Sequence, residues 1–254
     1  MQTTLEILTH PNLHGVKHGF FTRKGGASSG LFSGLNCGRR STDQTDMVAL
    51  NRARVATAMG VSADALATVK QVHSADVITL RDGDDIPTVA NTEADGIVTA
   101  RRDVALAVLT ADCQPILLAD TDAGVIGACH AGWRGALDGI IEAAVSAMRD
   151  LGATRIRAVI GPTISQRAYE VGHDFMDSFL AEDQAYDRFF SGGPNGRPMF
   201  DLPSFGLMRL RDAGVEAEWS GHCTYSDPDK FFSYRRATYE GKADYGRLIS
   251  AIRL

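Results

Sequence analysis

The clearest structural signal in this sequence is an apolar stripe with helical spacing that follows residue 134. Its members end just before Gly152 and fall at offsets of 0, 3, 4, 7, 8, 11 and 14: Leu137, Ile140, Ile141, Ala144, Val145, Met148 and Leu151. A helix with one apolar side is stable when that side packs against another layer. We therefore expect this helix to cover a β-sheet.

Short apolar runs with strand-like composition supply that sheet. Two further helices are expected, one from Thr45 to Gly60 and one that begins near Pro203 and ends at Gly214. Because strands and helices mix without strict alternation, the pattern favours an α+β fold with mixed sheets over a doubly wound parallel sheet. The expected strands are Thr68–Leu80, Gly96–Thr99, Val104–Leu109, Pro115–Ala119, Gly124–Cys129, Ile156–Ile160, Val215–Trp219 and Leu248–Leu254.

Length and composition indicate a single globular domain. The chain has 254 residues, of which 44% are hydrophobic and 22% charged, and both fractions are ordinary for a protein with a large core. The strongest cluster of turn-forming residues is Ser191–Pro198, and only about 55 residues follow it, too few for a comfortable second core. We interpret that cluster as a surface loop and expect one domain over residues 1–254.

The charge balance and the apolar segments exclude several classes of partner. The 26 Lys and Arg residues against 31 Asp and Glu residues give a net charge of −5, so a basic nucleic-acid footprint is not expected. The start, MQTTLEILTH, lacks the pattern of a secretory signal, and Val104–Ala119 is too short and too polar to cross a bilayer. We expect a cytoplasmic protein without a membrane partner.

Three polar residues interrupt or end apolar runs: His73 in VKQVHSADV, Cys113 in AVLTADCQPILL and His130 in VIGACHAGWRG. Functional groups collect where strands give way to turns. Two imidazoles and one thiolate suit Zn²⁺ and leave a fourth position for water, although copper accepts the same ligands. Taken singly, each histidine is more often a hydrogen-bonded structural residue than a ligand, and a cysteine in an apolar run is usually a small buried hydrophobic residue.

A glycine-rich segment, FTRKGG followed by SSGLF, carries Arg23 and Lys24. Glycines allow backbone N–H groups to turn inward, and the two cationic side chains add donors, so this loop could hold an oxyanion such as phosphate. A glycine-rich hairpin tip explains the same residues, because the spacing matches neither a Walker loop nor a dinucleotide fingerprint.

Two other segments combine aromatic and cationic side chains. HAGWRG joins a strand to the expected helix, and Trp133 and Arg134 within it could line a pocket near the helix N-terminus. FFSYRR near the C-terminus contains Tyr234 and Arg235, which could contact a flat base. The alternative for both segments is that the aromatic rings seal the core while the arginines make surface ion pairs.

Eight ordered motifs cover nearly the whole chain: HGFFTRKGGASSGLFSGLN (18–36), KQVHSADV (70–77), EADGIVT (93–99), LTADCQPILLAD (109–120), GACHAGWRG (127–135), IGPTISQRAYEVG (160–172), FDL (200–202) and CTYSDPDKFFSYRR (223–236). Together they resemble the YfiH family, also called the polyphenol oxidase or laccase-domain family, which includes purine nucleoside phosphorylases and peptidoglycan editing factors. The resemblance implies an α/β/β/α-type sandwich with mixed sheets, similar to Cys-dependent toxin hydrolases.

The resemblance also implies a zinc ion held by His73, Cys113 and His130. The implied activity is phosphorolysis of adenosine, inosine and methylthioadenosine, with deamination of adenosine to inosine as a second reaction. In deamination the metal would activate a water molecule for attack on the amino-bearing purine carbon. The implied small-molecule partners are therefore purine nucleosides and phosphate.

Roles for other residues follow from the same expectation. Arg23 would orient phosphate, and Lys24, Arg134, Tyr234 and Arg235 would contribute to substrate binding. Asp112 precedes the expected metal-binding cysteine and is our candidate for a catalytic proton shuttle. A buried carboxylate that orders the turn explains Asp112 equally well.

Three other functions remain open at this stage. A copper-dependent polyphenol oxidase of the laccase type needs several coppers with many histidine ligands, and the chain contains seven histidines. A Cys-His hydrolase would use Cys113 as nucleophile with His130 or His73 as base. A role in editing a peptidoglycan precursor is the third alternative, and metal analysis separates the first two from the zinc enzyme.

Overall fold

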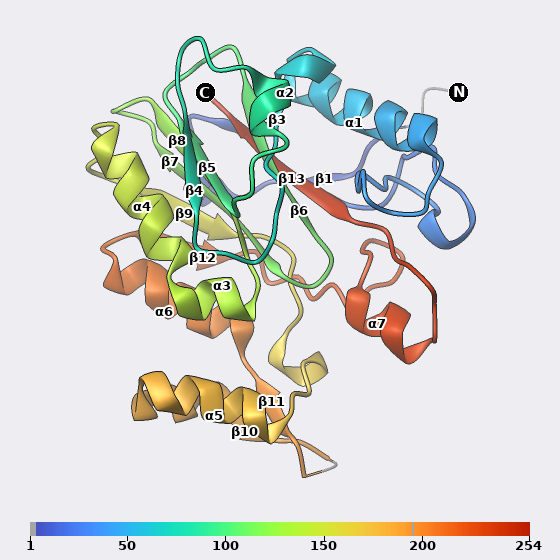
Figure 1. Ribbon diagram of the computed structural model, residues 1–254, viewed down its shortest axis with the longest axis vertical. Coiled ribbons are helices and arrows are strands. Elements are labelled where there is room, and N and C mark those ends of the chain that lie inside the picture. Colours follow the sequence, from blue (N-terminus) through green and yellow to red (C-terminus); the bar gives the residue numbers. More distant parts are fainter. Residues whose placement is uncertain (1–3, 195) are drawn as a thin grey trace.

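Two mixed β-sheets packed face to face form the centre of the molecule (Figure 1). The structure is a computed structural model and describes residues 4–194 and 196–254. The first three residues of the amino-terminal segment, and Asn195 within the predicted surface loop, lie outside the described residues.

The two large sheets have five and six strands, in the orders β1-β2-β13-β6-β3 and β12-β9-β7-β8-β5-β4, and a hairpin of β10 and β11 stands apart from them. Each large sheet contains both parallel and antiparallel pairs, as the sequence predicts. The strands are β1 Ile7–Leu8, β2 Lys17–Phe21, β3 Leu66–Ala67, β4 Val77–Leu80, β5 Gly96–Thr99, β6 Ala105–Thr110, β7 Gln114–Asp120, β8 Val125–Ala131, β9 Arg157–Ile160, β10 Phe190–Gly192, β11 Pro198–Phe200, β12 Glu216–Trp219 and β13 Leu248–Arg253.

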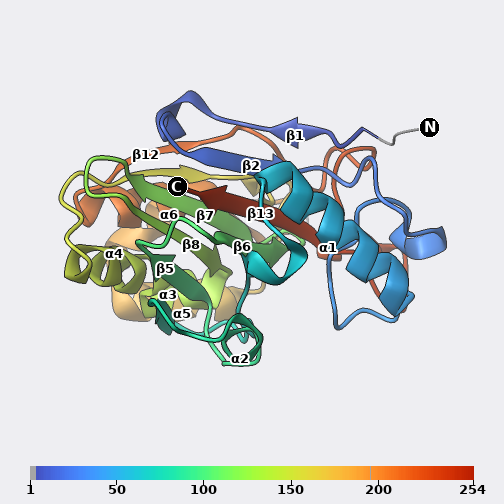
Figure 2. The same cartoon turned by 90° about the horizontal axis from the view of Figure 1, so that it is seen from above.

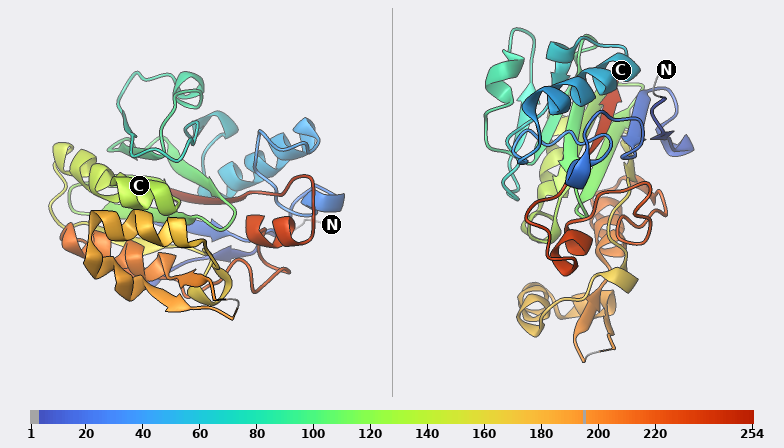
Figure 3. Two further views of the ribbon diagram at one scale, coloured as in Figure 1. Left: turned by 60° about the horizontal axis from the view of Figure 1, so that its bottom comes forward. Right: turned by 90° about the vertical axis from the view of Figure 1, so that its right-hand side faces the viewer.

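Helices lie on both sides of the paired sheets, and the left view of Figure 3 shows α1 on one side and α4 to α6 on the other. The α-helices are α1 Thr45–Met59, α2 Ile86–Val89, α3 Trp133–Asp138, α4 Ile140–Asp150, α5 His173–Glu182, α6 Leu202–Asp212 and α7 Tyr234–Tyr239. Short 3₁₀ turns occupy Pro11–Leu13, Gly30–Phe32, Ala63–Ala65, Gln166–Ala168 and Gln184–Phe189. Within residues 4–194 and 196–254, none of the helices combines the length and the apolarity needed to cross a bilayer.

Strand alternation explains the four layers. In β7, Leu117 contributes to the core between the two sheets, whereas Ile116 and Leu118 face α4. In β6, Leu106 faces the other sheet, and its neighbour Ala107 packs with the residues of α1. The result is the α/β/β/α sandwich that the family resemblance implies, and Figure 2 shows the strands between α4 and α1.

Two of the predicted helices are confirmed and one is divided. α1 ends at Met59 and is capped by Gly60, which has a φ of 77°, and α6 begins at Leu202 with Pro203 in its first turn. The stripe after residue 134 forms two helices, α3 and α4, because the backbone at Gly139 has a φ of 101° and interrupts the helix. Both helices still pack on the six-stranded sheet, as expected.

The predicted strand Thr68–Leu80 is wrong over most of its length. β3 belongs to the five-stranded sheet and β4 to the six-stranded sheet, so the intervening residues 68–76 must cross from one sheet to the other. His73, in the middle of this crossing, has a φ of 65°, which is incompatible with a strand. The predicted loop Ser191–Pro198 is partly a hairpin, since its two ends pair as β10 and β11.

The core between the sheets yields a stability prediction. Leu106 is fully buried there, whereas Leu50 on α1 is 42% exposed. We expect Leu106→Ala to lower the free energy of unfolding by about 2–5 kcal/mol, because it leaves a cavity, and Leu50→Ala to change it by less than about 0.5 kcal/mol. Urea denaturation measures both, and equal losses would contradict the assigned layers.

Candidate metal centre

Two connections that cross between the sheets carry His73 and Cys113. His73 lies between β3 and β4, and Cys113 lies between β6 and β7. His130 lies in β8, where it pairs with Pro115 of β7, so the register places it two residues from Cys113 across the ladder. The topology therefore brings together three residues separated by 40 and 17 positions in the sequence.

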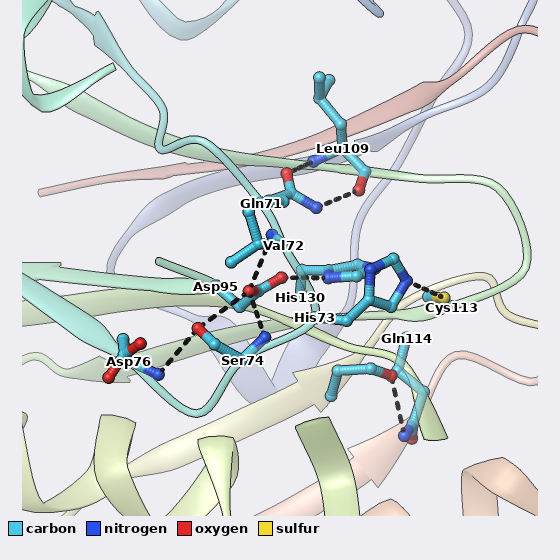
Figure 4. Close-up of polar contacts among 11 residues, drawn as sticks. Gln71, Val72, His73, Ser74, Asp76, Asp95, Leu109, Cys113, Gln114 and His130 are labelled. Atoms are coloured by element: carbon cyan, nitrogen blue, oxygen red, sulfur yellow. Dashed lines mark hydrogen bonds and ion pairs between the residues drawn. The ribbon is translucent and has the colours of Figure 1, made fainter. Parts of the chain in front are cut away.

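The donor atoms of these three residues lie within 4.8 Å of one another. Figure 4 shows the imidazoles of His73 and His130 near Cys113, and the His73 Nε2 lies 3.8 Å from the Cys113 Sγ. The two imidazole rings are 4.7 Å apart between centroids and nearly perpendicular. In a tetrahedral zinc site, sulfur and nitrogen ligands are about 3.5 Å apart. The His73–Cys113 pair lies close to this distance, and the three residues together form a possible His-Cys-His metal site.

Asp95, immediately before β5, holds two of these ligands through its two carboxylate oxygens. Oδ1 lies 2.7 Å from the His130 Nδ1, which leaves the Nε2 of that ring for a metal. Oδ2 accepts hydrogen bonds from the Val72 N–H, the Ser74 N–H and the Ser74 hydroxyl, on either side of His73. Asp95 therefore fixes both the ring of His130 and the loop that carries His73 (Figure 4).

The charges in this cluster favour a thiolate at Cys113. Burial alone would raise the pKa of the thiol, but the charges and hydrogen bonds of His130 and His73 lower it to about 6. Burial would lower the pKa of His130, but Cys113 and Asp95 raise it to about 9. The thiolate is the form of cysteine that binds a metal.

Close backbone packing shapes the site. Gly132, which follows β8, lies so near the ligands that a Cβ at this position would be 2.8 Å from the His73 Cδ2 and 3.2 Å from the Cys113 Sγ. Among the described residues other than glycine, only His73 and Asp112 have a positive φ, of 65° and 86°. Such conformations are costly outside glycine, so the surrounding contacts must hold both connections in place.

Asp112, the candidate proton shuttle, has a buried carboxylate surrounded by donors. Its Oδ1 accepts a hydrogen bond from the Thr224 hydroxyl at 2.6 Å. Its Oδ2 accepts bonds from the Ser233 hydroxyl at 2.9 Å and the Arg235 N–H at 2.7 Å. Burial raises the pKa of this carboxyl group, and the hydrogen bonds oppose that rise. These contacts tie the turn of Cys113 to the C-terminal segment, which matches the second of the two roles considered for Asp112.

Two cavities border the ligands, and His73, Ala111 and Cys113 line both of them. The first, which we call the aromatic cavity, has a volume of about 510 Å³ and is lined by the rings of Trp133, Tyr169, Phe175, Tyr234 and Tyr239. The second, which we call the cationic cavity, has a volume of about 350 Å³ and is also lined by His130. The candidate metal centre is therefore accessible to molecules in either cavity.

The structure brings only some of the predicted substrate-binding residues to this centre. Tyr234 and Arg235 line the aromatic cavity. Arg134 is exposed beside Trp133 and lines neither cavity. Arg23 and Lys24 line a separate hollow that contains none of the three ligands. The guanidinium of Arg23 donates to the Ser33 and Pro228 carbonyls instead.

Asp95 and Gly132 are the main site residues that reasoning from the sequence did not identify. Asp95 immediately precedes a buried strand, and a carboxylate in such a position signals a buried hydrogen-bonding role. Gly132 lies two residues after the candidate ligand His130 in HAGWRG, and its lack of a side chain leaves room for His73 and Cys113 as well as for the strand-to-helix turn.

The role of Asp95 leads to a prediction about metal affinity. We expect Asp95→Asn to weaken zinc binding by about 10–100-fold, because His130 loses its charged partner and the His73 loop loses its anchor. Asp76→Asn is the matched control, since Asp76 is an exposed carboxylate on the same loop. Competition with a chromogenic chelator measures the affinity, and equal values for the two variants would contradict the role of Asp95.

The close packing at Gly132 gives a second prediction. Gly132→Ala should displace His73 or Cys113 and reduce the zinc content of the purified protein to well below that of the unaltered chain. Gly192→Ala is the control, because a Cβ at Gly192 would meet no atom within 4 Å. Elemental analysis of both variants tests this, and a full zinc content in Gly132→Ala would show that the ligands tolerate the added methyl group.

Known proteins resemble this chain over most of its length. The family model described as multi-copper polyphenol oxidoreductase laccase matches residues 17–254. A purine nucleoside phosphorylase from Deinococcus radiodurans is 43% identical, with 91% of this chain and 88% of that protein covered. One from Corynebacterium glutamicum is 36% identical, with 91% and 94% covered.

Solved structures show the same fold. The Bacillus licheniformis hypothetical protein YfiH has a TM-score of 0.89 at 30% identity and covers all of this chain and 97% of its own. YlmD from Geobacillus stearothermophilus has a TM-score of 0.86 at 28% identity, with 99% and 98% covered. This chain therefore belongs to the YfiH, or laccase-domain, family that its sequence motifs indicate.

Proposed function

We propose that this protein is a zinc-dependent purine nucleoside phosphorylase that acts on adenosine, inosine and methylthioadenosine and also deaminates adenosine. The observation that carries the proposal is the cluster of His73, Cys113 and His130 beside an aromatic cavity of about 510 Å³. Relatives that share 36–43% of their residues with this chain are named purine nucleoside phosphorylases, which supports the same reaction class.

The aromatic cavity has the chemistry to hold a nucleoside. Purine bases stack on aromatic side chains, and such stacking contributes about 1–3 kcal/mol per base. The rings of Trp133 and Phe175 pack together, with centroids 4.7 Å apart, and form one apolar wall. Arg235 lies over the ring of Tyr169 and donates to the Glu170 carbonyl, so it adds a fixed positive charge beside these rings.

In phosphorolysis, a phosphate oxygen forms a bond to the anomeric carbon while the bond from that carbon to the purine nitrogen breaks. The electron pair remains on the purine, which takes up a proton and leaves as the free base. A bound zinc ion would supply Lewis-acid chemistry to this centre. Asp95 keeps His130 and His73 oriented, and Asp112 fixes the turn that carries Cys113. The chain thus contributes mainly preorganised binding and orientation.

A Cys-His hydrolase is the second candidate, because the lowered pKa of Cys113, about 6, also suits a nucleophile. A cysteine that ligates zinc is not free to attack a substrate, so the two functions make opposite predictions for metal content. The description of the matching family model raises copper-dependent phenol oxidation as a third reaction. That reaction predicts several copper ions per chain rather than one zinc.

The reaction itself provides the first test. The purified protein is incubated with adenosine, with and without phosphate, and the products are separated by chromatography. We expect adenine and ribose 1-phosphate only when phosphate is present, and inosine in both cases, because water is the attacking species in deamination. Unchanged adenosine under both conditions would refute the proposal.

The role of the ligands is tested separately. Cys113→Ser should reduce zinc content sharply and abolish both reactions, because two remaining protein ligands hold zinc poorly. Cys223→Ser is the matched control, since Cys223 lies outside the cluster and its Sγ accepts hydrogen bonds from Ser165. Activity that survives in Cys113→Ser would show that Cys113 is structural.

A further inference from the structure

The cationic cavity differs from the aromatic cavity in its charge. Its described lining contains no aspartate or glutamate, and it borders all three candidate metal ligands. A concave surface that carries charge of one sign attracts and concentrates ions of the opposite sign. The cationic residues that line it are Arg39, Arg40, Arg52, Lys70 and Arg247.

Arg52 is the buried member of this group. It lies on α1 with 6% of its surface exposed. Its guanidinium donates to the Thr68 hydroxyl at 3.2 Å and weakly to the Cys37 carbonyl at 3.5 Å. Among the described residues it forms no ion pair, although buried arginines are usually paired with a carboxylate.

Among the described residues, the carboxylates near this cavity are engaged by other cations, so none of them neutralises the guanidinium of Arg52. Lys70 is paired with Glu93 at 2.6 Å, and Arg247 lies 3.8 Å from Asp244. Burial, and then the charge of Arg39, lowers the pKa of Arg52 to about 10, so it remains protonated at neutral pH. An unpaired buried cation destabilises the fold because it has lost its hydration, and a bound anion would offset that loss.

The hollow around Arg23 and Lys24 lacks these properties. Arg23 already donates to the Ser33 and Pro228 carbonyls and lies 4.3 Å from the centre of the Phe232 ring. The same hollow contains the carboxylate of Asp229 and none of the metal ligands. An oxyanion there would have fewer free donors and would be outside the cavities that meet at the candidate metal centre.

We propose that the cationic cavity binds the inorganic phosphate used in phosphorolysis, with Arg52 as its buried anchor and Arg39 and Arg40 at the exposed side. This inference rests on the proposed function. Because His73 and Cys113 line both cavities, phosphate in the cationic cavity and a nucleoside in the aromatic cavity would meet at these residues. Planar guanidinium groups match the geometry of phosphate oxygens.

Direct binding and kinetics test this site together. Inorganic phosphate is titrated into the purified protein by calorimetry without nucleoside, and the KM for phosphate is measured with inosine as substrate. We expect Arg52→Gln to weaken phosphate binding and raise this KM by at least about tenfold, because a charged hydrogen bond is lost. The KM for inosine should change little.

Matched variants keep the result interpretable. Arg54→Gln is the control, because Arg54 lies on the same helix but donates to the Gly25 carbonyl and does not line the cavity. The double variant Arg39→Gln, Arg40→Gln changes only exposed residues, so it tests the site even if Arg52→Gln fails to fold. This double variant should weaken phosphate binding several-fold and make that binding less sensitive to the salt concentration.

The outcomes separate this inference from the proposed function. If inosine is cleaved in a phosphate-dependent way but phosphate binding is unchanged in the Arg52 and Arg39-Arg40 variants, the inference is overturned and the proposed function stands. A loss of phosphate binding in Arg23→Gln would then place phosphate in the hollow around Arg23 and Lys24. Arg52-dependent phosphate binding without cleavage of any nucleoside would refute the phosphorylase but support the anion site. Adenosine 5′-monophosphate is titrated into the purified protein in the same way, as a further test. Arg52-dependent binding of this nucleotide without binding of free phosphate would overturn the inference.

Discussion

The hydrogen bonds of the Asp95 carboxylate are the interaction on which the candidate site depends most. One oxygen holds the imidazole of His130, and the other holds the backbone on both sides of His73. The main chain of Asp95 also accepts the His130 N–H at 2.7 Å. One buried residue therefore sets the position of two candidate metal ligands that come from different segments of the chain. Its cost of burial is offset by four hydrogen bonds and by the charge of the imidazole.

The position of the site follows from the way the two sheets are connected. The chain crosses between the sheets at residues 68–76 and again at residues 111–113, and each crossing carries one ligand. These crossings are non-regular backbone at the edge of a packed core, where side chains are both exposed to ligands and held rigidly. The same edge separates an aromatic cavity from a cationic one, so two chemically different molecules can approach the same three residues.

The sequence pointed to His73, Cys113 and His130 as candidate ligands because polar residues that end apolar runs are conspicuous, and the structure brings these three residues together. The helix-end residues Gly60 and Pro203 located α1 and α6. Predictions from the sequence were wrong or missing where contacts between distant segments determine the conformation or the burial of a residue. The alternation around His73 resembles a strand, yet the two ends of that segment belong to different sheets. In the sequence, Arg52 looks like an ordinary exposed residue of a helix. The structure shows that it is buried and has no carboxylate partner among the described residues. Asp95 was missed for the same reason.

The proposed function requires a zinc ion held by three protein side chains. Crystals of the protein as purified, measured with X-rays on both sides of the zinc absorption edge, test this most directly. We predict one anomalous peak per chain, bound by the Nε2 atoms of His73 and His130 and the Sγ of Cys113, because the Nδ1 of His130 is occupied by Asp95. A zinc peak elsewhere, several copper sites, or an anomalous map without any peak at these residues would contradict it.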